Sequence, residues 1–231
     1  MPVDATATRD KLITAGELMF ATRGVEAAQL RDIVRAAGQS NDSAIHYHFG
    51  SRDGLLVAIC EKHIAAMEPE RQQLLDELHE QGAEGDIDAI VTALVLPTVR
   101  KLASQDGRYF LRIMAQLAGR VGISDGGTPA PVLGTALFEE LSLLRAACAE
   151  LMPQQLADER IEAMISLFTA AMADRAIKID RRRRLALDQH TFTDNIISMW
   201  AAALRAPLPD GYARRATQSP SRRRTTSRSA S

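Results

Sequence analysis

Residues 30–52 read LRDIVRAAGQSNDSAIHYHFGSR, and this stretch decides the fold. Four apolar residues spaced three or four apart mark one side of a helix: Leu30, Ile33, Val34 and Ala37. Gly38 can adopt the positive φ that ends such a helix. Ile45 and Phe49 are four residues apart and can pack inward from a second short helix. The stretch therefore predicts a helix-turn-helix, the layout that places a recognition helix in the major groove of DNA.

A further helix is expected before this stretch and another after it. The first has one stripe of apolar and small residues: Leu12, Ala15, Gly16, Met19 and Phe20. Thr8 is its expected N-cap, and Gly24 suits its end. Ser40 is expected to cap the recognition helix, and Ser51 is expected to cap a long fourth helix that continues to about Met67.

The short helix around Ile45 leaves polar side chains on its outer face. These are Asn41, Asp42, Ser43 and His46. Amide, hydroxyl and imidazole groups can meet the donors and acceptors on base edges, so this face is a candidate for reading sequence.

Residues 8 to about 63 resemble the amino-terminal DNA-binding domain of the tetracycline-repressor (TetR-like) family of bacterial transcription regulators. The motifs that carry the resemblance are Gly24-Val25-Glu26, Leu30-Arg31-Asp32-Ile33, Ala37-Gly38, Tyr47-His48-Phe49-Gly50-Ser51-Arg52 and Leu55-Leu56. It implies an all-α fold, with an N-terminal three-helix helix-turn-helix domain followed by a larger helical ligand-binding and dimerisation domain. Together with the polar face, it gives the expected DNA-binding residues: Gln39, Ser40, Asn41, Asp42, Ser43, His46, Tyr47, His48 and Arg52. The resemblance implies that Tyr47 and Arg52 contact phosphates.

Two positions depart from the family pattern. Ala28 stands where the family usually has Thr or Ser, so a capping bond worth about 1 kcal/mol is either missing or supplied otherwise. Phe49 lies eleven positions after Gly38, one more than in the commonest members. The longer spacing leaves open which of residues 40–43 reaches the bases.

Length and composition indicate a folded protein of more than one domain. The chain has 231 residues, of which 46% are hydrophobic, and we expect three parts: residues 1–52, 53–206 and 207–231. No apolar run approaches the ~20 residues of a membrane span, and the first residues lack the apolar core of a signal peptide, so a cytoplasmic protein without a membrane partner is expected. Cys60 and Cys148 are expected to be buried, reduced thiols.

The net charge of −1 conceals an asymmetry. Residues 205–231 hold seven Arg and one Asp, whereas residues 1–52 hold six basic and six acidic residues. The first domain therefore has no excess of positive charge that would attract DNA regardless of its sequence. The basic tail is too polar to order itself; it is either an idle disordered extension or an arm that attracts phosphates.

Past residue 52 the pattern predicts helices throughout. Expected are residues 87–103 bent at Pro97, 109–121, 131–151, a helix capped by Asp158 that reaches about Lys178, and 188–204, with a loop at 122–131. Arg108, Arg112, Gln116 and Arg120 are interpreted as a solvent-facing side. The run Arg181–Arg184 is expected to follow a helix end, where cations favour the helix dipole.

The last two helices resemble the dimerising pair of the family. The expected interface residues are Ile161, Ile165, Phe168, Ile196, Met199 and Trp200, and the alternative for the same stripes is ordinary intramolecular core. An effector pocket is expected among the middle helices, lined by Leu94, Phe110, Met114, Leu117, Leu137, Leu141, Phe168 and Met172, for which plain core is again the alternative.

No pattern of catalytic or metal-ligating residues stands out, so neither enzymatic activity nor a cofactor or metal is expected. The sequence predicts a homodimeric, ligand-responsive, DNA-binding transcriptional regulator. It is expected to be a repressor that a small, largely apolar effector releases from a palindromic operator in double-stranded DNA. The alternative is a helical small-molecule-binding or scaffold protein that keeps the headpiece shape without useful DNA affinity.

Overall fold

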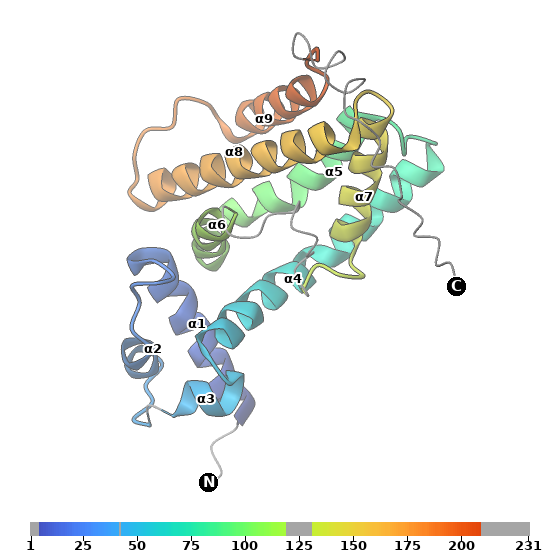
Figure 1. Cartoon of the computed structure of the whole chain (residues 1–231). Helices are drawn as coiled ribbons and strands as arrows, with labels where there is room; N and C mark the ends of the chain where they lie inside the picture. The colour runs from blue at the N-terminus through green and yellow to red at the C-terminus, as the bar shows by residue number, and fades with distance from the viewer. Residues whose placement is uncertain (1–4, 42, 119–130, 209–231) are drawn as a thin grey trace, which may run out of the picture.

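The computed structural model describes residues 5–41, 43–118 and 131–208, and in these the chain is all-α (Figure 1). The helices are α1 (Ala5–Arg23), α2 (Leu30–Ala36), α3 (Ala44–Phe49), α4 (Arg52–Glu80), α5 (Ile87–Arg100), the 3₁₀ turn η1 (Lys101–Ala103), α6 (Gln105–Leu117), α7 (Ala136–Ala149), α8 (Gln154–Asp180) and α9 (Gln189–Leu204). The expected loop at 122–131 and the basic tail fall almost entirely outside the described residues.

Helices α1, α2 and α3 pack on the start of α4 around one group of buried apolar residues, which we call the headpiece cluster. Its members are Leu12, Ile13, Ala15, Phe20, Ala21, Val25, Ala28, Ile33, Val34, Ala37, Ile45, Leu55, Ala58, Ile59 and Ile113. Gly24 and Gly38 have φ of 97° and 69°, as the predicted helix ends require.

Two predicted caps in this part are wrong. Thr8 lies buried inside α1, because the helix-forming Ala5 and Ala7 extend the helix upstream. Ser40 makes no capping bond to α3; instead the Asn41 side-chain oxygen accepts from the backbone N–H of Ser43 at 2.9 Å. Helix α2 starts after Gln29, whose side chain makes no capping bond. The capping bond that Ala28 cannot make is therefore not supplied by Gln29 either.

Helix α4 joins the headpiece to the rest of the protein (Figure 1). Its predicted N-cap is confirmed, since the Ser51 hydroxyl accepts from the backbone N–H of Gly54 at 3.0 Å. The predicted end near Met67 is wrong, because the helix continues through Pro69 to Glu80. Proline costs a helix one hydrogen bond, but burial of Arg71 and Leu75 beyond it holds the second half in place.

The second half of α4 packs with α5, α7, α8 and α9 around a larger group of buried residues, the body cluster, which includes Leu75, Val91, Leu144, Phe168 and Trp200. Helix α6 lies between α1 and α8 and packs against both (Figure 1). None of the described helices is long and apolar enough to span a membrane.

The body helices were predicted in the right order but with shifted ends. Helix α9 was predicted over 188–204, and Asp188 is its N-cap, with its side chain 2.8 Å from the N–H of Thr191. Asp158 does not begin a helix; it lies in α8 and accepts from Arg145 at 2.8 Å. Pro97 lies inside α5 as expected, and the chain then tightens into η1. Cys60 and Cys148 are free thiols, and burial raises the pKa of Cys60 to about 11.

Candidate nucleic-acid interface

The outer face of α3 is set by what the inner face buries. Ile45 is fully buried in the headpiece cluster, and Phe49 packs against the same cluster under the guanidinium of Arg9, 5.3 Å from the ring centroid. Because these residues hold one side of the helix, Ser43, His46 and Tyr47 are left exposed. Tyr47 is 80% exposed, which is exceptional for an aromatic residue in a packed domain.

The predicted base-reading residues lie in and just before α3. Asn41 and Ser40 are exposed and Gln39 is half-buried, whereas Asp42 lies outside the described residues. Asn41 uses its side-chain oxygen on Ser43, so its side-chain amide N–H groups remain for another partner. His48 is half-buried with its ring edge-on to Tyr47, at 4.9 Å between centroids.

His46 is held by the end of its own helix. Its Nδ1 lies 3.0 Å from the carbonyl oxygen of Gly50, and the backbone N–H of Gly50 donates to the carbonyl of His46 at 3.0 Å. Gly50 has a φ of 74°, which a residue with a side chain adopts only with strain. The ring is therefore fixed by a reciprocal pair of contacts.

Arg52, a predicted phosphate ligand, has a structural partner in this protein. Its Nη1 donates to the carbonyl oxygens of Val25 at 2.6 Å and Glu26 at 3.2 Å, in the loop between α1 and α2. Arg52 thus ties that loop to the start of α4, and a phosphate contact by Arg52 stays a prediction.

A second side chain holds the same loop from the body. The Gln116 amide of α6 donates to the carbonyl of Phe20 at 3.2 Å and accepts from the N–H of Val25 at 2.8 Å. The predicted solvent-facing side of this helix is therefore wrong at Gln116. It is also wrong at Arg108, which forms an ion pair with Asp180 of α8. The sequence held no signal for either contact, since the partners are 96, 91 and 72 residues away.

A buried polar pair joins α1 to α4. Glu17 and His63 are each only 1% exposed, with 3.0 Å between the carboxylate and Nε2. The His63 ring stacks on Phe110 of α6, at 4.4 Å between centroids. Phe110, a predicted pocket residue, thus packs at the junction of α1, α4 and α6.

The other predicted pocket residues do not gather around one cavity. Leu94, Phe168 and Met172 are buried in the body cluster, and Leu137 and Leu141 pack against it. Leu117 packs against the headpiece cluster, and Met114 is half-buried in α6. An open pocket of about 710 Å³ lies elsewhere, between α5 and α9, and is lined by Thr92, Leu96, Gln189, His190, Thr193, Asp194, Ile197 and Ser198.

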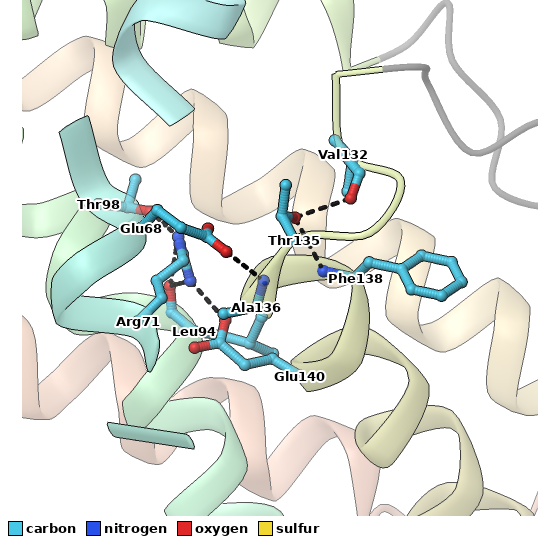
Figure 2. A network of polar contacts seen from close by, with 9 residues as sticks. All are labelled: Glu68, Arg71, Leu94, Thr98, Val132, Thr135, Ala136, Phe138 and Glu140. Carbon is cyan, nitrogen blue, oxygen red and sulfur yellow. Dashed lines mark hydrogen bonds and ion pairs between the residues drawn. The ribbon is translucent and has the colours of Figure 1, made fainter. Parts of the chain in front are cut away.

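A charged network lies inside the body, between α4, α5 and α7 (Figure 2). Arg71 and Glu140 are 2% and 0% exposed and form an ion pair at 2.5 Å. Arg71 also donates to Thr98 at 3.0 Å, and Glu68 accepts from the N–H of Ala136 at 2.7 Å. Burial raises the pKa of Glu140 to about 7, although Arg71 opposes the shift.

The predicted interface helices bury most of their apolar stripes within the chain itself. Phe168 and Trp200 pack together at 5.4 Å between ring centroids, and both belong to the body cluster, as do Ile161 and Ile196. Leu167 of α8 and Met199 of α9 are each 46% exposed. The described contacts of Phe168 and Trp200 are those of intramolecular core, which was the alternative to a dimer interface for these residues.

Comparison with known proteins was made on sequence and on structure. Residues 12–59, which cover α2, α3 and most of α1, match the model described as "Bacterial regulatory proteins, tetR family". The amino-terminal domain is TetR-like. A search of curated protein sequences gave no significant match.

Solved structures resemble the chain beyond this TetR-like domain. A HlyIIR mutant protein is 13% identical, with 85% of this chain and 97% of that chain covered and a TM-score of 0.51. A putative TetR-family transcriptional regulator from Rhodococcus sp. (15% identity, 86% and 99% coverage, TM-score 0.47) and the fatty acid degradation regulator FadR from Bacillus halodurans (14%, 83% and 97%, 0.48) are also similar. At these identities the likeness concerns the fold.

Proposed function

We propose that this protein is a ligand-responsive, DNA-binding transcriptional regulator, in which α3 reads bases in the major groove. The observation that carries the proposal is the exposed polar face of α3 within a TetR-like helix-turn-helix. Asn41, Ser43 and His46 offer groups that can meet base edges, and Tyr47 is exposed enough to reach a phosphate or a base.

A response to a ligand requires that the body and the headpiece change together between two conformations. Gln116 and the Glu17–His63 pair join α6 and α4 to the headpiece, so a change in the packing of α6 would move the loop before α2. A small, largely apolar effector that binds one body conformation better would shift the equilibrium by its difference in affinity for the two states. We assign the chain as a repressor that the effector releases.

A homodimer would present two copies of α3 to two half-sites of a palindromic operator. We place the interface on the exposed faces of α8 and α9, around Leu167 and Met199. Small neighbours on the same faces, Ala163, Ala170 and Ala202, are exposed and would allow close approach of helices from a partner. Trp200 and Phe168 would then support the interface from beneath.

The test is enrichment of genomic DNA fragments on the purified full-length protein, followed by sequencing. We expect a palindromic sequence, and Asn41→Ala should weaken binding to it by about 1–3 kcal/mol with little effect on random duplex. Ser142→Ala, a change on the exposed side of α7, is the control and should leave binding unchanged. Recovery of fragments without a shared sequence would instead favour a helical scaffold or small-molecule-binding protein.

A further inference from the structure

His46 presents only one free nitrogen to a partner outside the protein. A carbonyl oxygen can only accept, so the Nδ1 atom that lies 3.0 Å from the Gly50 carbonyl must carry the hydrogen. A neutral imidazole has one N–H, so Nε2 then carries a lone pair and no hydrogen. His46 is exposed, and its Nε2 makes no hydrogen bond with the described residues.

The backbone around Gly50 fixes this tautomer. The N–H of Gly50 is already used on the His46 carbonyl, so the Gly50 carbonyl is the group left for the ring. The left-handed φ of Gly50 turns the chain at this point, directly before the Ser51 cap of α4. The ring orientation of His46 is therefore a consequence of how α3 ends, and a flexible surface histidine would lack it.

We propose that neutral His46 is a hydrogen-bond acceptor that selects a base carrying an amino group in the major groove. Adenine offers its N6 amine there and cytosine its N4 amine, whereas guanine and thymine offer acceptors and the thymine methyl group. Every base pair carries one such amine, on its adenine or its cytosine, so Nε2 would fix which way round the base pair that it contacts lies in each half-site. This inference rests on the proposed function and adds the class of base that one residue recognises.

The experiment is selection from a random-sequence DNA duplex pool by the full-length protein at pH 8, with His46→Ala and His46→Arg selected in parallel. Wild type should enrich one base pair about tenfold over the same pair reversed at one position of each half-site. His46→Ala should lose the preference at that position alone. His46→Arg, which can only donate, should favour guanine in place of the adenine or cytosine of that base pair.

Ser142→Arg is the control for the added charge, because it places the same charge on the exposed side of α7. It should leave the base preference at the His46 position unchanged. Thermal unfolding of each variant checks that α3 still packs, and unfolding temperatures close to wild type are expected because His46 is exposed.

Two results overturn the inference in different ways. A wild-type pool with a clear consensus that His46→Ala leaves unaltered, or a His46→Arg pool that does not put guanine in place of the adenine or cytosine of the base pair that His46→Ala relaxes, overturns the role of His46 and leaves the proposed function intact. A wild-type pool without any consensus overturns the proposed function and the role of His46 with it.

Discussion

Raising the pH through neutrality should weaken the folded protein, and Glu140 is the group responsible. Its carboxylate is 0% exposed, and Arg71 contacts one oxygen at 2.5 Å while the other oxygen, Oε1, has no partner among the described residues (Figure 2). An ionised carboxylate in this position forgoes its hydration without full compensation. Burial therefore raises the pKa of Glu140 from its ordinary 4.5 to about 7.

The sign and size of the effect follow from linkage. Because the folded state binds the proton more tightly than the unfolded chain, the stabilisation is complete below about pH 4.5 and is lost as the pH rises through 7. At about 1.4 kcal/mol for each unit of pKa, the whole loss is about 3 kcal/mol. Most of it falls between about pH 5 and pH 8, the range in which folded proteins are usually at their most stable.

Urea unfolding of wild type and Glu140→Gln at several pH values would measure this loss. A glutamine does not ionise, so the difference in unfolding free energy between the two proteins should change by about 2–3 kcal/mol between pH 5 and pH 8, in favour of the variant. Ser142→Ala, which changes no titratable group on the exposed side of α7, is the control and should give a difference that does not depend on pH. Parallel stability curves for wild type and Glu140→Gln would refute the reasoning.

Three further changes test other parts of the structure. Gln116→Leu removes the contacts of α6 to Phe20 of α1 and to Val25 in the loop before α2, and leaves the N–H of Val25 without its acceptor, so it should cost about 1–3 kcal/mol of unfolding free energy and weaken operator binding; unchanged values in both assays would mean that the amide bridge carries no coupling. Met199→Glu should give folded monomers in sedimentation, with the helical circular dichroism of wild type, and a persistent dimer would move the interface away from α9. Deletion of residues 212–231 should leave thermal stability unchanged and lower the salt dependence of binding to random duplex, whereas identical slopes would make the tail an inert extension.

The features predicted correctly from sequence depend on nearby residues. Ser51 caps α4 through a bond to a residue three positions away, and Gly24 and Gly38 end helices through their own φ. Helix ends that depend on distant packing were missed. The sequence around Pro69 signals a break, yet α4 continues because Leu75 beyond it is buried in the body cluster.

In the candidate interface, too, the features that depend on nearby residues were predicted and those that depend on distant residues were not. The outward face of α3 follows from the spacing of Ile45 and Phe49, which is local. The partners of Arg52 and Gln116 are 27 and 91 residues away, and no periodicity indicates such contacts. The stripe around Trp200 was recognised as apolar, but periodicity alone does not tell whether its partner is Phe168 of the same chain or a helix of a second copy.

Ile113 of α6 has a consequence for how the protein is made. Its side chain is fully buried in the headpiece cluster, although Ile113 lies more than fifty residues after the first residue of α4. During translation, the first four helices leave the ribosome with an apolar gap that is filled only when α6 follows. The nascent headpiece therefore stays incomplete until about half of the chain has been synthesised, and a fragment that ends before α6 would lack one buried member of the headpiece cluster and tend to aggregate.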